Sequence, residues 1–197
     1  IGMIAHFWIE EFSGMAWSAA SVTTGVLFVA GRIAVLLRHS PVPGAVILHI
    51  RLACLNLAIA ATMGVLLGFD KVLHFLPGFV LNNVFAHAHL AAVGWATMMV
   101  VGVGYRLLPM VLPSKAPTGA TLYISAALLE TGVLGLFATL LLRSAWSRLF
   151  GALILAGLAA FIAHVLPMVG QRVRRPPGAP RVDYAALHAA AAGICML

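Results

Sequence analysis

The stretch AHAHLAAVGWATMMVVGVGYRLLPM, from Ala86 to Met110, carries two histidines at the start of a long apolar run. At about 1.5 Å per residue, it is long enough to cross a bilayer as a helix. Ionisable side chains inside a spanning helix are costly and usually mark a functional site. Because neutral imidazole is the commonest metal ligand in proteins, the pattern predicts that His87 and His89 are ligands.

The spacing of the two histidines predicts two separate sites. Positions two apart on an α-helix differ by about 200° of rotation, so His87 and His89 point to nearly opposite faces. Small residues lie beside both: Ala91 and Gly94 on the face of His87, and Ala92, Val93 and Ala96 on the face of His89. Such residues leave room for a flat macrocycle, but they also suit tight helix packing in membranes, and the sequence leaves both interpretations open.

The composition is that of a polytopic membrane protein. Of the 197 residues, 62% are hydrophobic and 9% charged, and the mean hydropathy is +1.05. We therefore predict an all-α membrane helix bundle, a single transmembrane domain over residues 1–197. The five expected spans are Met15–Leu37, Ala45–Phe69, Val84–Met110, Ala120–Leu142 and Leu149–Val169. A truncated sixth begins near Tyr184, and because the chain starts at Ile1, we expect it to be part of a longer polypeptide.

Proline and glycine clusters separate these spans and leave no room for a soluble domain. The connector from Asp70 to Asn83 is apolar, so it is expected to form a short interfacial helix. The opening segment, from Ile1 to Gly14, is interpreted as the tail of an earlier helix or as an interfacial piece with an aromatic anchor.

Charges in the loops predict the orientation. One side carries eight basic residues: Arg32, Arg38, Arg106, Lys115, Arg172, Arg174, Arg175 and Arg181. The other side carries three: Lys71, Arg143 and Arg148. The positive-inside rule makes the first side cytoplasmic and places His87 and His89 near the outer face. The net charge of +7 therefore reflects topology and affinity for membrane lipid, and nucleic acid is excluded as a partner.

A family resemblance supports the ligand prediction. The His-x-His pair, the Gly-rich run and the closing Tyr105-x-x-x-Pro109 resemble the tenth helix of subunit I of the haem-copper oxidases, and more closely its distant bacterial relatives. The resemblance implies a bacterial inner (plasma) membrane protein with b-type haem. His87 would be the proximal ligand of a high-spin haem and His89 an axial ligand of a low-spin haem. The five spans would correspond to helices eight to twelve.

The resemblance also implies a function and partners. It favours electron transfer, with other membrane subunits or electron-donor proteins as partners; reduction of O2 or nitric oxide, and so enzymatic activity, stays open. Copper stays open too, because the family's copper ligands would precede Ile1. The family holds haem propionates with an adjacent arginine pair. Here Arg143 and Arg148 lie five apart around Trp146, and interfacial anchoring is the alternative.

Further polar residues lie in or near the expected spans. Glu130 lies near the bilayer middle, where a carboxylate needs a partner or a proton, and it is a candidate for a proton route. Arg51 is expected to extend to the interface, whereas Asn56 is expected to bond another helix. Three histidines lie near the cytoplasmic ends of the spans, where they would reach interfacial water or form a second cluster: His49, His164 and His188. His6 and His74 are candidates for auxiliary ligands on the outer side. Cys54 and Cys195 are interpreted as packing thiols.

Two other classes of function stay open. One is a non-catalytic membrane subunit of a respiratory or photosynthetic complex, with a structural or pigment-binding role. The other is a transporter whose buried polar residues line a path, although no pair of broken helices in matching halves supports it.

Overall fold

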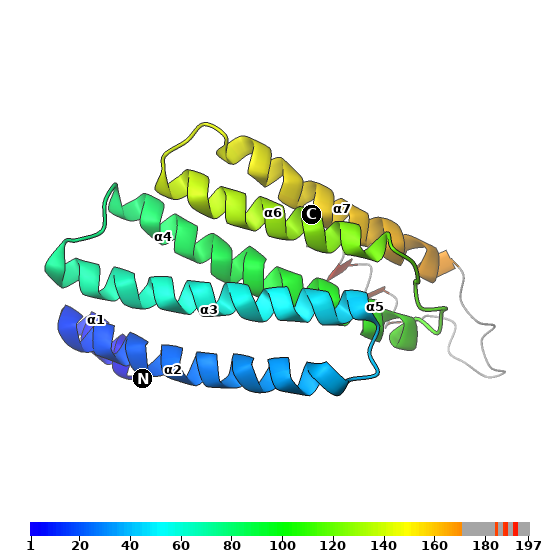
Figure 1. Cartoon of the computed structure of the whole chain (residues 1–197), viewed down its shortest axis with the longest axis horizontal. Coiled ribbons are helices and arrows are strands. Elements are labelled where there is room, and N and C mark those ends of the chain that lie inside the picture. The colour runs from blue at the N-terminus through cyan, green and yellow to red at the C-terminus, as the bar shows by residue number, and fades with distance from the viewer. Residues whose placement is uncertain (171–183, 185–186, 189–190, 193–197) are drawn as a thin grey trace.

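The structure is built from long helices that run up and down (Figure 1). The computed structural model describes residues 1–170, 184, 187–188 and 191–192. Within these residues, the elements are α1 (Gly2–Trp8), α2 (Phe12–Leu36), the 3-10 turn η1 (Leu37–His39), α3 (Gly44–Leu73), α4 (Val80–His89), the π-helical η2 (Leu90–Thr97), α5 (Met98–Val111), α6 (Leu122–Leu141) and α7 (Ser147–Gly170). No β-strand occurs in this part of the chain, and the all-α prediction is confirmed.

In the part of the chain that the structure describes, five helices are long and apolar enough to cross a membrane, as predicted. Their ranges are Phe12–His39, Gly44–Leu73, Val80–Val111, Leu122–Leu141 and Ser147–Met168. The third range joins α4, η2 and α5 into one continuous span that begins four residues before the predicted start. The predicted sixth segment, Cys195 and the arginines from Arg172 to Arg181 lie outside the described residues, apart from the isolated positions given above.

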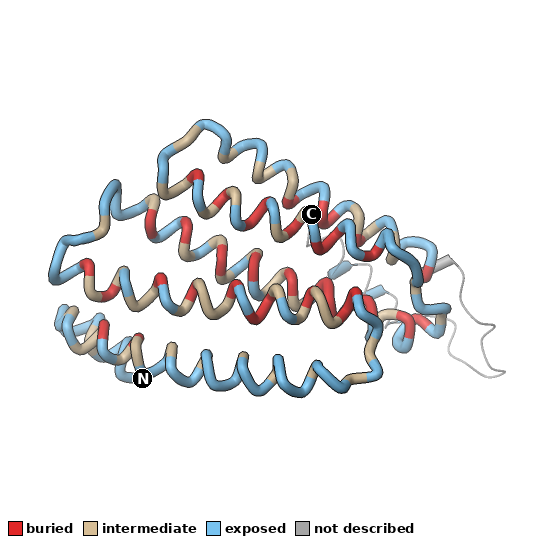
Figure 2. The backbone as a smooth tube through the Cα atoms, viewed as in Figure 1, coloured by how far each residue is buried: buried red, intermediate tan, exposed pale blue. Residues whose placement is uncertain are grey.

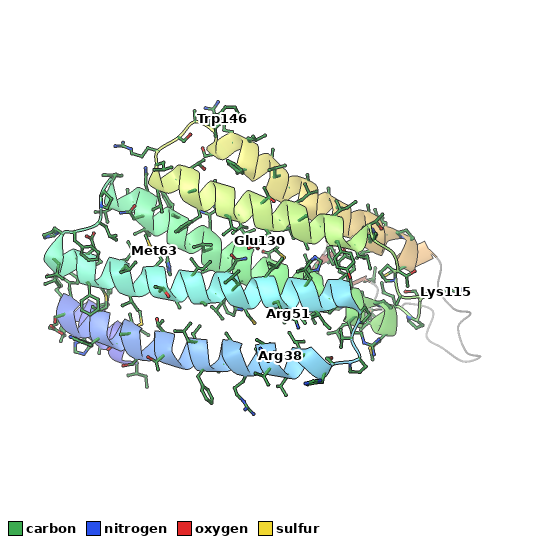
Figure 3. The ribbon with its side chains drawn as sticks, in the orientation of Figure 1. Arg38, Arg51, Met63, Lys115, Glu130 and Trp146 are labelled. Atoms are coloured by element: carbon green, nitrogen blue, oxygen red, sulfur yellow. The ribbon has the colours of Figure 1, made fainter. Side chains whose placement is uncertain are left out.

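The spans alternate in direction, so the connections gather at two ends. We call them the Trp146 end and the Lys115 end, after residues labelled in Figure 3. The Trp146 end holds the connections 74–79 and 142–146, and the Lys115 end holds the connections 40–43 and 112–121. A Cβ atom added at Gly78 would lie 3.9 Å from the Leu141 carbonyl oxygen, so the α3–α4 connection lies against the end of α6.

Buried apolar side chains of α3, α5, α6 and α7 form the core. Glycines let α6 and α7 approach closely: a Cβ atom added at Gly132 would lie 2.9 Å from the Ile154 nitrogen, and one added at Gly157 would lie 3.0 Å from the Leu129 nitrogen. Small residues at such crossings suit membranes, where packing rather than water drives helix association. The core is therefore centred on α3 and the spans beyond it, and α2 lies at one edge (Figure 2).

The connection between α3 and α4 corrects a prediction. No separate helix covers Asp70 to Asn83, because α3 continues to Leu73 and α4 begins at Val80. His74 ends α3 in a left-handed conformation, with φ of 50°. The buried Asp70 side chain then accepts a hydrogen bond from the Leu76 amide at 2.6 Å. This bond folds the connector into a compact turn, which leaves no free segment to form a helix of its own.

Candidate functional site

His87 lies in the last turns of α4 and faces α3. Its Nδ1 atom lies 3.0 Å from the Ala60 carbonyl oxygen, and a Cβ atom added at Gly64 would lie 3.2 Å from its Cε1 atom. Because a carbonyl oxygen can only accept a hydrogen bond, Nδ1 carries the hydrogen. The neutral ring then has its lone pair on Nε2, which has no hydrogen-bond partner among the described residues.

His89 has the same arrangement on another side of the helix. Its Nδ1 atom lies 2.7 Å from the Phe85 carbonyl oxygen one turn earlier, and its Nε2 atom is also unbonded in the described structure. The helix α4 is regular through both histidines, so the rotation of about 200° between them applies. A ring held by Nδ1 on a carbonyl, with Nε2 free, is the state in which histidine binds a metal.

The small residues beside the two histidines do not serve the same purpose. Gly94 is buried, and a Cβ atom added there would lie 2.9 Å from the Asn56 side chain and 3.0 Å from that of Val133. The face of His87 is therefore filled by α3 and α6. On the face of His89, Ala92 is exposed and Ala96 is half-buried. Room for a macrocycle, which the sequence indicated on both faces, remains only beside His89.

Glu130 is joined to both neighbouring spans through Asn56. The Asn56 amide donates to the Glu130 carboxyl oxygen Oε2 at 2.8 Å and lies 3.1 Å from the Gly94 carbonyl oxygen. Asn56 is fully buried and Glu130 is half-buried, about midway along their helices. Figure 3 shows Glu130 on α6, on the side that faces the bundle. The expected interhelical bond of Asn56 is therefore present, and it supplies a partner for the carboxyl group.

The π-helical stretch η2 was not predicted, because no pattern in the sequence indicates it. A wide turn changes where the backbone carbonyl groups point, and the Gly94 carbonyl within η2 accepts from Asn56. The Thr97 hydroxyl donates to the Ala92 carbonyl five residues earlier, at 3.0 Å. Wide turns of this kind are frequent at functional sites, and this one begins directly after His89.

A second polar cluster lies near the Lys115 end. The fully buried His49 ring bonds the Ala45 carbonyl through Nδ1 at 2.7 Å, and its Nε2 lies 3.0 Å from the Ser125 hydroxyl. That hydroxyl lies 3.0 Å from the Tyr105 hydroxyl, which is 3.4 Å from His164 Nδ1. His164 Nε2 lies 3.0 Å from the Thr121 hydroxyl. Both ring nitrogens of His49 and His164 are therefore engaged.

This cluster corrects one expectation and extends another. His49 does not reach interfacial water, because it is fully buried in the core. His164 does join it through Tyr105 and Ser125, as the possible second cluster required. No described contact brings in His188, which is exposed and bonds the Tyr184 carbonyl. Ser125 and Thr121 were missed, because single hydroxyl residues in an apolar run give no pattern.

The remaining candidates lie towards the Trp146 end. His6 pairs with Glu11 at 3.0 Å and His74 is exposed, so neither is joined to His87 or His89 by a described contact. Arg143 and Arg148 are exposed on either side of Trp146, which Figure 3 shows at the tip of the α6–α7 connection. Within the described residues, no group of three or more histidine, cysteine or acidic side chains could hold a metal ion. No protein-family profile, curated protein or solved structure matches the chain.

Proposed function

We propose that this chain is a haem-binding integral membrane protein that transfers electrons, as its resemblance to the C-terminal part of haem-copper oxidase subunit I implies. The observation that carries the proposal is the contrast among the buried and half-buried histidines. His87 and His89 each have Nδ1 on a backbone carbonyl and Nε2 unbonded in the described structure. The other two such rings in the spans, His49 and His164, have both nitrogens bonded to the protein.

The residues fit a haem better at His89 than at His87. Beside His89, the exposed Ala92 leaves the helix surface open, and the Phe85 carbonyl fixes the ring. His87 packs on Gly64, so binding there requires its ring to turn away from α3. A bound b-type haem would supply the redox change, and the chain would hold and orient it. Arg143 and Arg148, exposed towards the same end, would meet the propionates.

The role proposed for Glu130 is to hold a proton at the middle of the bundle. Its Oε2 atom is oriented by the Asn56 amide, and no described cation lies within ion-pair distance of it. A carboxyl group held by an amide rather than by a fixed positive charge can exchange its proton without breaking an ion pair. We expect Glu130→Gln to slow proton-coupled turnover and leave the haem spectrum intact. Unchanged turnover would leave Glu130 with a packing role only.

Difference spectra of the full-length protein test the ligand assignment. In reduced-minus-oxidised and carbon monoxide spectra, His89→Ala should abolish a six-coordinate low-spin signal, and His87→Ala should disturb a five-coordinate one. His164→Gln is the matched control and should keep both signals, because its ring is already bonded at both nitrogens. Identical spectra for His87→Ala and His89→Ala would contradict two sites. Undisturbed haem content in both would contradict haem ligation.

We further propose a bacterial inner-membrane location with the Lys115 end in the cytoplasm. The support is the excess of basic residues on that side. In a variant without Cys54 and Cys195, single cysteines at Ala116 and Ala145 report the two ends. An impermeant thiol reagent added to intact cells should label Ala145→Cys and spare Ala116→Cys. The opposite labelling pattern would contradict this orientation.

A second candidate function is proton transport without haem. One observation favours it: polar side chains occur at three levels of the bundle, around His49, around Asn56 with Glu130, and at His87. The purified protein in liposomes tests it. Proton flux that needs Glu130 and occurs in protein without haem bands would favour transport. Redox-dependent haem bands without such flux would favour electron transfer, with a donor protein or membrane subunit as partner.

A further inference from the structure

The edge helix α2 packs tightly on α3 only near the Trp146 end. Its buried residues are Ala16 and Ala19, both in its first third, and Figure 2 shows the rest of α2 without buried positions. A Cβ atom added at Gly68 of α3 would lie 3.1 Å from the Ala16 Cα atom, so the backbones nearly touch there. Further along, the hydroxyl of Thr23 still donates to the Ala61 carbonyl of α3 at 3.1 Å. Beyond this bond, no residue of α2 is buried.

A groove of about 310 Å³ lies between this part of α2 and α3. From α2 it is lined by small and aliphatic residues between Leu27 and Leu37, and from α3 by Arg51, Cys54, Leu55 and Ala58. Ten residues of helix correspond to a length of about 15 Å, so the groove runs along several helical turns. Its lining is almost entirely apolar except for Arg51, which Figure 3 shows on the side of α3 that faces α2.

Arg51 has no acidic partner in the described structure. The only ion pair there joins His6 and Glu11, and Glu130 is bonded to Asn56. Arg51 lies seven residues after the start of α3, or about 10 Å along the helix, close enough for its long side chain to reach the headgroup level. Arg32 and Arg38 are exposed at the same end. Within the described residues, the guanidinium at the mouth of this apolar groove therefore has no counter-charge.

We propose that this groove binds one acyl chain of an anionic phospholipid, with its phosphate on Arg51. The charge decides the occupant, because guanidinium pairs with phosphate in a bidentate manner and basic pockets between spanning helices bind anionic headgroups. The apolar lining takes the acyl chain, which the surrounding bilayer supplies. The site is independent of the haem proposal, since it lies on α2 and α3 and includes neither His87 nor His89.

The test uses the full-length protein and two lipids that differ in charge, phosphatidylglycerol and phosphatidylcholine. Native mass spectrometry with either lipid should show phosphatidylglycerol retained and phosphatidylcholine lost. Arg51→Gln should lower retention of phosphatidylglycerol about tenfold or more, the effect of losing a hydrogen bond to a charged group. Arg51→Lys should restore part of it. Arg106→Gln, which removes an exposed arginine of α5 outside the groove, is the charge control and should bind as the wild type does.

A second pair of variants fills the groove without touching its charge. Gly31 lines the groove and a Cβ atom there meets nothing within 4 Å, so Gly31→Leu should fold and occupy the acyl-chain space. Gly25 is equally open but does not line the groove, and Gly25→Leu is the matched control. Loss of phosphatidylglycerol in Gly31→Leu alone supports the site. Three results would each overturn the proposal. The first is equal retention of both lipids, and the second is retention that Arg51→Gln and Gly31→Leu leave unchanged. The third is retention of neither lipid because another helix fills the groove.

Discussion

The two halves of the bundle use histidine in different ways. Towards the Lys115 end, His49 and His164 have both ring nitrogens bonded to carbonyl or hydroxyl groups of the protein. Towards the Trp146 end, His87 and His89 have one nitrogen on a carbonyl and the other unbonded in the described structure. Satisfied rings contribute mainly to packing, whereas a ring with a free lone pair can bind a ligand. Hydrogen-bond occupancy therefore separates four residues that look alike in sequence.

The comparison predicts the largest loss of stability for His49→Ala. The substitution empties a fully buried site and removes two hydrogen bonds, so we expect it to lower the free energy of unfolding by about 2–4 kcal/mol. Chemical unfolding in detergent measures this loss. The exposed His188→Ala is the control and should change little. A loss for His49→Ala below about 0.5 kcal/mol would show that its ring is not structural.

Gly94→Ala should have the next largest effect. The added methyl group would lie 2.9 Å from the Asn56 side chain and 3.0 Å from that of Val133, which is closer than van der Waals contact. Overpacking of this kind costs about 1–3 kcal/mol. The matched control is Gly25→Ala, where the methyl group meets nothing and the higher helix propensity of alanine acts alone. If Gly94→Ala and Gly25→Ala have the same free energy of unfolding, Gly94 is not a packing residue. The face of His87 would then be open for a ligand.

Tyr105→Phe should cost about 1 kcal/mol, because it keeps the ring but removes the hydroxyl that bonds Ser125 at 3.0 Å and lies 3.4 Å from His164 Nδ1. Combining it with Ser125→Ala in a double-mutant cycle isolates the coupling between the two hydroxyl groups. Additive losses would indicate that the hydroxyls do not interact, and the second cluster would then reduce to separate His49 and His164 contacts.

His89→Ala should have the smallest effect on stability, within about 0.5 kcal/mol of the wild-type protein without cofactor. Its ring is half-buried and bonds only its own helix. The same unfolding experiment used for His49→Ala measures it. A loss as large as that of His49→Ala would remove the difference between the two halves of the bundle.

The spans were predictable, because apolar length is a direct signal. The expected Ala45–Phe69 became Gly44–Leu73, and the other spans match equally closely except at one start. The start at Val84 was predicted because Asn82 and Asn83 look like loop residues in sequence. In the structure, the third span begins at Val80. In the structure, Asn83 is buried and its side chain bonds the Pro77 carbonyl at 3.3 Å. A hydrogen bond back to the preceding connector therefore overrides the usual preference of asparagine for loops.

The site was predictable only in part. The paired histidines and Glu130 stood out because ionisable residues are rare in apolar runs. The partners of these residues gave no such signal. The partners at Ala60 and Phe85 are backbone carbonyl groups, which every residue type has. The Asn56 bond to Glu130 joins positions 74 residues apart. The π-helical η2 is equally invisible, since the sequence LAAVGWAT is ordinary for a spanning helix. These features depend on how the spans pack.

The wide turns of η2 set the rotation between two parts of one span that both contact α3. On one side of η2, His87 must face the Ala60 carbonyl; on the other, Gly102 must face His49, because a Cβ atom there would lie 2.6 Å from the Cβ of His49. Each residue of an α-helix contributes about 100° of rotation and η2 is wound more widely, so removing a single residue from η2 would change the rotation of α4 relative to α5. The length of η2 thus sets which histidine faces the bundle and which faces outward.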